Sequence, residues 1–262
     1  MLSAREAQSA LGCANGAAAL LIEEVPDTIL RMSEPSSPPK CACCGADRNI
    51  RQLLPVLWPA LIAEWGLSAS EAEIVERREG LGCTACGVRL RSESLALAVL
   101  RAVESSNSFA GWAATRPTLR VLEINGAGEL SPWLAELPGR TLVGYPQFDM
   151  QTMSFGDESW DLLLHSDTLE HVVDPIQALR ECRRVLAPGG AMCFTIPFVP
   201  GRLTRRRDGL PPSYHGQEHD NAYLVITEYG ADFWTQLLDA GFERIELVAL
   251  QWPEAVSIVA RK

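Results

Sequence analysis

Short apolar runs alternate with helical stretches throughout the part of the chain that follows Pro117. The apolar runs, which are expected to be strands, cover residues 119–124, 141–145, 161–165, 191–197, 243–251 and 255–261. The helical stretches between them cover residues 129–137, 175–186 and 230–240. This alternation is typical of helices that cover a mostly parallel sheet. The sequence therefore predicts an α/β domain over residues 117–262.

Two breaks divide the chain before this domain. Residues 33–40, SEPSSPPK, cannot continue a helix, so residues 1–40 are interpreted as an N-terminal segment and linker. A helical run over residues 92–112 leads to Thr115-Arg116-Pro117, and the residue before a proline is disfavoured in a helix. Residues 41–116 are therefore predicted to form a separate, small Cys-rich and helical module.

The charge balance limits the partners of the protein. Asp and Glu number 33 against 23 Lys and Arg, which gives a net charge of −10. Such a chain has no general attraction for nucleic acid or for an anionic membrane. No apolar run approaches the roughly 18–20 residues that cross a bilayer, so no membrane partner is expected. Cysteine pairs with metal-ligand spacing favour a reducing cytoplasm.

Two CxxCG segments frame the Cys-rich module. They place Cys41 with Cys44 and Cys83 with Cys86. Each CxxCG turn can direct two thiolates at one point, and two such turns supply the four sulfur ligands of a structural Zn²⁺. Cys43 is a rival ligand, iron also accepts four thiolates, and four reduced cysteines in a loop-rich cap are the alternative without a metal.

The segment 121–128, VLEINGAG, joins an expected buried strand to an acid and a Gly-x-Gly turn. Such a turn lets a ligand approach the backbone, and the helix behind it presents free N–H groups. Many α/β proteins have a glycine turn at this place, so the segment alone does not identify a ligand.

Four segments together carry a family resemblance: 121–128, DMQTMSFGDESWD at 149–161, SDTLEHV at 166–172 and RVLAPGG at 184–190. In this order and spacing they resemble the class I S-adenosylmethionine-dependent methyltransferases, in particular the bacterial group called type 11. The resemblance covers roughly residues 118–262. It implies a Rossmann-like fold with a seven-stranded, mostly parallel sheet that has helices on both faces.

The resemblance also implies where the cofactor binds. Glu123, Gly126 and Gly128 would line its methionine part, Asp149 and Met150 would hold the adenine, and Ser166 and Asp167 would face the sulfonium and the substrate. An acid near the ammonium, backbone donors near the carboxylate and an apolar slot for the ring agree with these roles. The cofactor-binding residues expected are Glu123, Asn125, Gly126, Gly128, Gln147, Asp149, Met150 and Ser166.

Two of these positions depart from the family pattern. Asn125 stands near the first of the three glycines that the family usually has, and Gln147 follows the second strand where an acid usually binds the ribose. A neutral amide is a weaker hydrogen-bond acceptor than a carboxylate. The departures leave open reduced cofactor affinity, a different ribose contact or a catalytically inactive homologue.

The irregular segment 198–223 follows a strand at the carboxyl edge of the sheet, where ligands of open α/β folds bind. It is predicted to be a substrate lid. His215, with Tyr214 beside it, or Asp167 is expected to take a proton from the acceptor. His171 is interpreted as structural, and His165 and His219 are weaker candidates. The lid also contains arginines that could clamp a phosphate or carboxylate, or form a solvated basic loop: Arg202, Arg205, Arg206 and Arg207.

The sequence therefore predicts a methyltransferase that acts on an oxygen, or else a nitrogen or carbon, of a small molecule or sugar. The resemblance associates it with glycan or secondary-metabolite synthesis, with S-adenosylmethionine and a structural Zn²⁺ as cofactors. A catalytically inactive binding protein is one rival, and an RNA methyltransferase, which the negative charge disfavours, is another. The turn lacks the full G-x-G-x-x-G spacing of an NAD site. Association into a homo-oligomer is left open.

Overall fold

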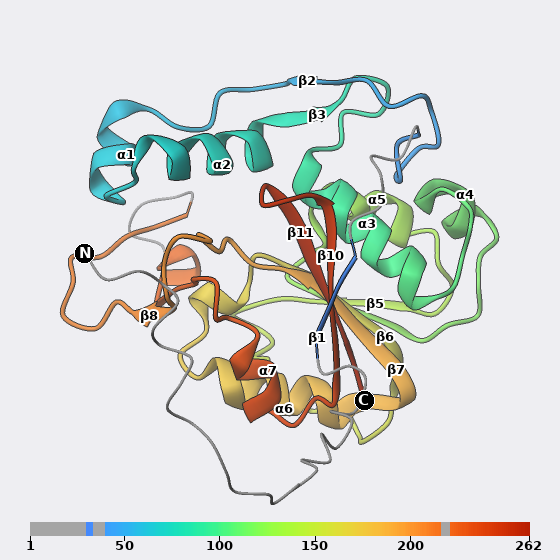
Figure 1. The fold of residues 1–262 in the computed structure, drawn as a ribbon. Coiled ribbons are helices and arrows are strands. Elements are labelled where there is room, and N and C mark those ends of the chain that lie inside the picture. The colour runs from blue at the N-terminus through green and yellow to red at the C-terminus, as the bar shows by residue number, and fades with distance from the viewer. Residues whose placement is uncertain (1–29, 34–39, 216–220) are drawn as a thin grey trace, which may run out of the picture.

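A mostly parallel sheet forms the centre of the computed structural model, which describes residues 30–33, 40–215 and 221–262 (Figure 1). Its order is β1-β10-β11-β7-β6-β4-β5. Within it β11 alone runs antiparallel to its neighbours. The strands are β1 (Leu30–Ser33), β4 (Val121–Ile124), β5 (Arg140–Val143), β6 (Trp160–Ser166), β7 (Leu186–Thr195), β10 (Arg244–Gln251) and β11 (Ala255–Arg261).

The part of the chain that resembles the methyltransferases supplies six of these strands. The remaining strand, β1, comes from the N-terminal segment and pairs in parallel with β10 at the edge of the sheet. After β5 the described chain forms turns until β6 begins, and it adds no strand beyond β5. The expected sheet is therefore confirmed as mostly parallel, but residues 117–262 do not build seven strands by themselves.

Helices cover both faces of the sheet. The α-helices are α1 (Pro59–Glu64), α2 (Ala69–Gly80), α3 (Leu90–Ala102), α4 (Phe109–Ala114), α5 (Ser131–Leu134), α6 (Pro175–Val185) and α7 (Thr235–Asp239). Short 3₁₀ turns lie at η1 (Gly128–Leu130), η2 (Leu169–His171) and η3 (Asn221–Tyr223). Two small sheets pair β2 (Ile50–Gln52) with β3 (Leu81–Cys83), and β8 (Arg205–Arg206) with β9 (Thr227–Glu228).

The core is divided by the sheet because successive side chains of a strand point to opposite faces. Along β6, Leu162 and Leu164 pack with α3, α4 and α5 on one face, whereas Leu163 packs with α6 and α7 on the other. Figure 1 shows α3 and α5 on the side of the sheet opposite to α6 and α7. The buried strand expected at residues 161–165 thus contacts both helical layers, because its alternate side chains pack against each of them.

The helical run expected over residues 92–112 forms two helices, not one. After α3 the chain turns at Glu104, which has a left-handed φ of 54°. The side chain of Ser108 then caps α4 by accepting a hydrogen bond from Gly111 N at 3.1 Å. Although the sequence assigns α3 to the Cys-rich module, its side chains Leu95 and Val99 are fully buried in the core that also contains sheet residues.

The N-terminal part of the module lies beside one end of the sheet, where α1, α2, β2 and β3 follow one another (Figure 1). The second helix, α2, begins with a capping box in which Ser68 Oγ accepts from Glu71 N and Glu71 Oε2 accepts from Ser68 N. No helix in the described part of the chain is long and apolar enough to cross a membrane.

If α3 is part of the sheet's core, Leu95→Ala should lower the free energy of unfolding by about 2–5 kcal/mol, because it leaves a cavity between helix and sheet. The exposed Leu238 in α7 offers a matched control, and Leu238→Ala should change stability by less than about 1 kcal/mol. Urea unfolding of both variants measures the difference. Equal, small losses would contradict the packing of α3 on the sheet.

Candidate active site and cysteine cluster

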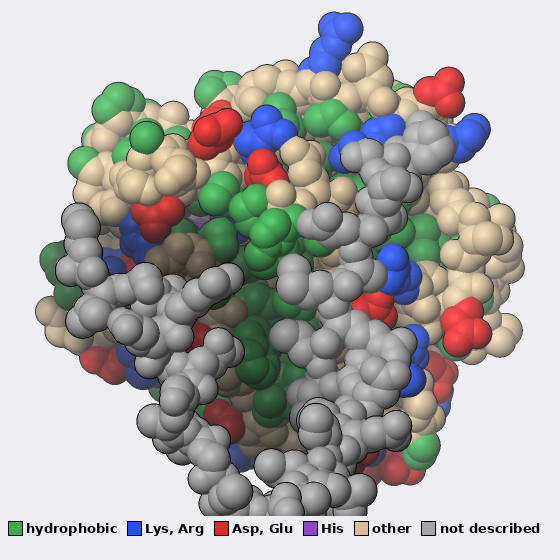
Figure 2. All heavy atoms as spheres, in the orientation of Figure 1, with side chains coloured by type: hydrophobic (Ala, Val, Ile, Leu, Met, Phe, Trp, Pro, Cys, Tyr) green, Lys and Arg blue, Asp and Glu red, His purple; other side chains and the backbone are tan. Residues whose placement is uncertain are grey.

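A cavity of about 2060 Å³ opens at the carboxyl ends of β4, β5 and β6. Its walls come from the turn after β4, the segment after β5, the residues after β6, the lid expected at residues 198–223, and helices α1 and α2. On the face shown in Figure 2, hydrophobic side chains gather near the centre, and charged side chains lie around them. The Cys-rich module therefore forms part of the wall of the cavity.

Glu123 at the end of β4 is fully buried and does not line this cavity. Its carboxylate accepts hydrogen bonds from Ala127 N at 2.8 Å and from Ser131 Oγ, and it pairs with Arg140 Nε at 2.7 Å. The side chain therefore holds the turn after β4 in shape, and the charge that was expected to meet the cofactor's ammonium is paired with Arg140.

The turn after β4 presents two of its expected residues to the cavity. Asn125 and Gly126 line the cavity and have left-handed φ values of 56° and 87°. Asn125 Oδ1 accepts a hydrogen bond from Tyr145 N at 2.8 Å, so this side chain ties the turn to the segment after β5. Gly128 lies elsewhere: a Cβ atom there would stand 2.8 Å from Ser92 Oγ of α3, so its role is close packing.

The segment after β5 brings Gln147, Asp149 and Met150 to the cavity. Met150 is buried, whereas Asp149 is exposed and accepts hydrogen bonds from Gln151 N and Nε2. Leu142 and Tyr145 add apolar surface beside them, although both are about half exposed. An apolar wall with a carboxylate at its edge can bind a flat ring that carries an amino group.

Ser166, at the end of β6, and Asp167, which follows it, are joined by a partly buried arginine that the sequence did not single out. Arg91 Nη1 of α3 donates to Ser166 Oγ and to Asp167 Oδ2, both at 2.9 Å. Thr195 Oγ1 donates to Asp167 Oδ1 at 2.8 Å. Burial opposes the charge of Arg91, but the nearby carboxylates of Asp167 and Glu79 raise its pKa. Both carboxylate oxygens of Asp167 are thus held by hydrogen bonds.

The three histidines in the described residues have different surroundings. His215 and Tyr214 line the cavity, and the His215 ring contacts Trp65 at 5.4 Å and His171 at 5.5 Å between ring centroids. His171, expected to be structural, also lines the cavity. Burial in the sheet lowers the pKa of His165 to about 3, so its imidazole is neutral. His219 lies outside the described residues.

The arginines of the lid are paired with acids of the same chain. Arg205 and Arg207 pair with Glu228, and Arg206 pairs with Asp208. Arg202 pairs with Glu71 at 2.7 Å and also donates to the backbone oxygens of Trp65 and Gly66. These pairs fix the lid to β9 and to the Cys-rich module, and they occupy the groups that could otherwise clamp an anion.

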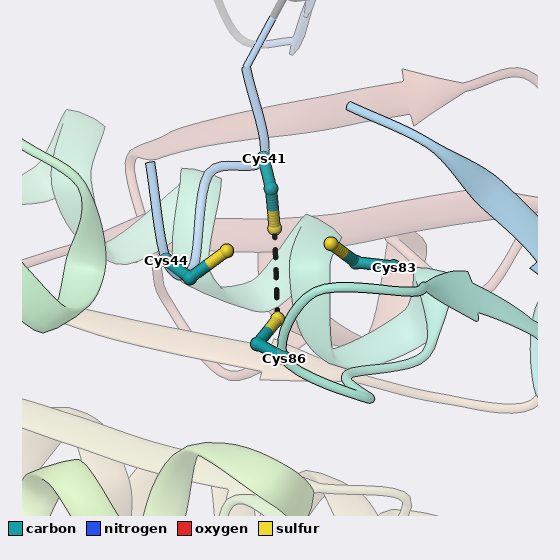
Figure 3. A group of neighbouring side chains, drawn as sticks. All are labelled: Cys41, Cys44, Cys83 and Cys86. Atoms are coloured by element: carbon teal, nitrogen blue, oxygen red, sulfur yellow. Dashed lines mark hydrogen bonds between the residues drawn. The ribbon is translucent and has the colours of Figure 1, made fainter. Parts of the chain in front are cut away.

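The four cysteines of the two CxxCG segments meet beside α3. Their sulfur atoms all lie within 4.8 Å of one another, and Figure 3 shows Cys41, Cys44, Cys83 and Cys86 pointing toward a common centre from two loops. The two loops have the same backbone hydrogen bond: Gly45 N donates to Cys41 O, and Gly87 N donates to Cys83 O. Both glycines have left-handed φ values, 77° and 75°.

The cluster excludes Cys43, which the sequence left as a rival ligand. Cys43 is buried and is not a member of the four-sulfur group. The cluster contains no disulfide, because its members are free thiols, and the Cys41 and Cys86 sulfurs lie 3.9 Å apart. A hydrogen bond from Cys43 lowers the pKa of Cys41 to about 4, which favours a thiolate.

Comparison with known proteins gives a match in the central part of the chain. A family profile described as a methyltransferase domain matches residues 86–194, which run from the second CxxC segment to β7. The matched segment is therefore similar to a methyltransferase domain, and it includes α3, which the sequence had placed in the Cys-rich module.

Two curated relatives are similar over shorter segments. The chain is 36% identical over 110 residues to a ubiquinone biosynthesis O-methyltransferase of Cereibacter sphaeroides, which covers 37% of this chain and 44% of the relative. It is 34% identical over 109 residues to a protein of Mycolicibacterium smegmatis named "Probable S-adenosylmethionine-dependent methyltransferase". This match covers 38% of this chain and 37% of the relative. The matches thus span less than half of these relatives' own length.

Solved structures are more distant. A chain of an S-adenosylmethionine-dependent methyltransferase from Mesorhizobium loti aligns with a TM-score of 0.32 and 15% identity, over 58% of this chain and 96% of that one. The YcgJ protein of Bacillus subtilis aligns with a TM-score of 0.36 and 15% identity. This alignment covers 60% of this chain and 70% of that one.

The ion pair between Glu71 and Arg202 predicts a pH-dependent attachment of the lid. The hydrogen bond from Arg202 lowers the pKa of Glu71 from 4.5 to about 2, so the pair's stabilisation is present above pH 4.5 and is lost as the pH falls toward 2. At pH 7, Glu71→Gln should speed amide hydrogen exchange in residues 198–215 roughly twofold to fivefold, the range for a partly exposed pair.

Glu73→Gln is the control for this measurement, because Glu73 is exposed on the same helix. It should leave the exchange of the lid unchanged. The difference between Glu71→Gln and the unaltered protein should shrink below pH 4.5, and a difference that persists at low pH would refute the assignment to the ion pair.

Proposed function

We propose that the protein is an S-adenosylmethionine-dependent methyltransferase that methylates an oxygen of a small molecule or sugar. The observation that carries this proposal is the cavity at the carboxyl ends of β4, β5 and β6. It unites Asn125, Gly126, Asp149, Met150 and Ser166 from three of the four sequence segments. The methyltransferase domain match over residues 86–194 and the names of the two relatives support the same chemistry.

The residues of the cavity fit the proposed cofactor in part. Gly126 leaves room for an approach to the backbone, since a Cβ atom there would meet no atom closer than 3.6 Å. Met150 and Leu142 provide apolar surface for an adenine ring, and Asp149 provides an exposed acceptor. S-adenosylmethionine would supply a methyl group attached to a positively charged sulfur. Ser166 and Asp167 would add negative charge and polarity near that end.

His215 is the residue proposed to take the proton from the molecule that receives the methyl group. Both oxygens of Asp167 are engaged by Arg91 and Thr195, whereas His215 places an imidazole, a common general base, in the wall of the cavity. Tyr214 lies next to His215 in the same wall and would help to position the acceptor. Methyl transfer is an in-line displacement, so alignment by the cavity contributes more than strong acid–base chemistry.

We also propose that Cys41, Cys44, Cys83 and Cys86 bind a structural Zn²⁺. Zn–S bonds of about 2.3 Å in a tetrahedron place sulfurs roughly 3.8 Å apart, close to the 3.9 Å between Cys41 and Cys86. Four thiolates complete the coordination and leave no position for water, so the ion would stabilise the module and take no part in the reaction.

A catalytically inactive binding protein is the second candidate. One observation in its favour is Gln147, which stands where the family usually has a ribose-binding acid. The other is the ion pair between Glu123 and Arg140, which neutralises the charge expected to meet the cofactor. Such a protein would keep the cavity but bind the cofactor weakly or fail to transfer its methyl group.

Titration calorimetry with S-adenosylmethionine and S-adenosylhomocysteine tests the cofactor site. We expect micromolar binding that Asp149→Ala weakens by roughly tenfold to a hundredfold, the effect of losing one charge-assisted hydrogen bond. Asp239→Ala, at an exposed position at the end of α7, should bind like the unaltered protein. Binding without transfer to any hydroxylated acceptor would favour the inactive protein, and no binding at all would refute the proposal.

Native mass spectrometry tests the zinc site. Cys44→Ser and Cys86→Ser should each lose about one equivalent of zinc and unfold at lower temperature, because binding of a structural ion contributes to folding. Cys182→Ala is the control, since it removes a buried thiol of α6 outside the cluster and should retain the ion. An unchanged number of zinc equivalents in both cluster variants would disprove the site.

A further inference from the structure

Glu170, in the η2 turn after β6, is fully buried, and its backbone oxygen accepts a hydrogen bond from Ile226 N at 2.7 Å. Neither Oε1 nor Oε2 accepts a hydrogen bond from a described residue. The nearby Arg91 gives its hydrogen bonds to Ser166 and Asp167 and also pairs with Glu79. A buried carboxylate that lacks donors is costly, so a group that neutralises Glu170 is expected beside it.

Two histidines face this carboxylate. His171 Nε2 and His215 Nδ1 each lie 3.5 Å from Glu170 Oε1. The other nitrogen of His171, Nδ1, lies 2.9 Å from Leu224 O, and a carbonyl oxygen can only accept. Nδ1 therefore carries the hydrogen, and the Nε2 atom of a neutral His171 directs its lone pair at the carboxylate. Such an arrangement needs a cation, or a proton, between the two atoms.

We propose that Glu170, His171 and His215 bind a divalent transition-metal ion in the wall of the cavity. Their ligand atoms all lie within 4.8 Å of one another. Metal–ligand bonds of about 2.1 Å in a tetrahedron place ligand atoms roughly 3.4 Å apart, and the two distances to Glu170 Oε1 are 3.5 Å. The hydrogen bond from His171 Nδ1 to a backbone carbonyl is the usual support of a metal-binding imidazole.

The ligand set indicates which ions fit. Two imidazoles and one carboxylate suit Zn²⁺, Mn²⁺, Fe²⁺ or Co²⁺ better than Ca²⁺ or Mg²⁺, which prefer oxygen. Three protein ligands leave at least one coordination position open, in contrast to the four sulfurs of the cysteine cluster. All three residues line the cavity, so the open position would be available to a molecule bound there.

The role of this ion rests on the proposed function, although its binding does not. In a methyltransferase the open position would take the acceptor's oxygen, and a bound cation lowers the pKa of a hydroxyl that coordinates it. The proposed acceptor class narrows accordingly to molecules with a phenol, an enol or two neighbouring oxygens. His215 would then be an ion ligand, and the proton of the coordinated hydroxyl would pass to solvent water and not to His215.

Protonated histidines are the alternative explanation for the cluster. Two imidazolium groups would each donate a hydrogen bond to Glu170, and such charge-assisted bonds are about 2.7–2.9 Å long. Both observed distances, 3.5 Å, exceed that range and fit a shared cation better.

Metal analysis of the whole chain separates these explanations. Protein stripped with a chelator and reloaded with Zn²⁺ should bind two equivalents, one at the cysteine cluster and one at the proposed site. Glu170→Gln and His215→Ala should each keep the first equivalent and weaken the second by roughly a hundredfold or more. Glu158→Gln, which alters an exposed acid paired with Lys262, should keep both.

Two further readouts keep the test decisive if a variant folds poorly. Zn²⁺ should raise the melting temperature of a Cys44→Ser, Cys86→Ser chain, and adding Glu170→Gln should abolish that rise. Co²⁺ should broaden and shift the ring-proton NMR signals of His171 and His215 in the unaltered protein. One equivalent in the unaltered protein, or two in both site variants, would overturn the site.

The outcomes also distinguish this site from the proposed function. Binding of S-adenosylmethionine with a single zinc equivalent would overturn the metal site and leave the methyltransferase proposal standing. A second equivalent without any cofactor binding would do the opposite.

Discussion

The guanidinium of Arg91, which is largely shielded from solvent, connects three parts of the molecule around the cavity. From α3 it reaches Asp167 and Ser166 after β6, and it pairs with Glu79 of α2. A cation shielded from water is stabilised by the carboxylates around it, so the sheet, α3 and the Cys-rich module all contribute to its environment. The polar end of the cavity is therefore assembled from three distant parts of the chain.

The same constraint explains why the module belongs to the wall of the cavity and is more than an attachment. Trp65 and Glu64, at the end of α1, line the cavity, and Arg202 of the lid donates to the backbone beside them. The cysteine cluster packs in the same core as α3. An ion held by the four thiolates would thus stabilise the wall that selects the acceptor, far from any contact with the acceptor itself.

The sequence predicts the layered fold because strands and helices leave local signatures. The apolar run at β6 and the helical spacing of α6 arise from burial that each element experiences on its own. Pairings across the chain leave no such signature. Arg91 meets Asp167 across 76 residues, Glu123 takes Arg140 as its partner, and β1 joins the sheet from the N-terminal segment. These contacts decide which charges are free, so the roles expected of Glu123 and Asp167 could not be settled from their motifs.

Glu170 differs from the other acids near the cavity in its ion-pair partners. Around the cavity Asp167, Glu71 and Glu228 all have an arginine partner, and Glu123 has Arg140 behind the turn. Glu170 is more deeply buried than most of these acids, and within the described residues its carboxylate lies at ion-pairing distance from two imidazoles and from no arginine. Arg91 attracts it at longer range, but the hydrogen bonds of Arg91 go to Ser166 and Asp167, which leaves room for a cation from outside the chain. The cavity would thereby combine a fixed anionic end at Asp167 with an exchangeable positive charge at Glu170, the polarity that an acceptor hydroxyl losing its proton requires.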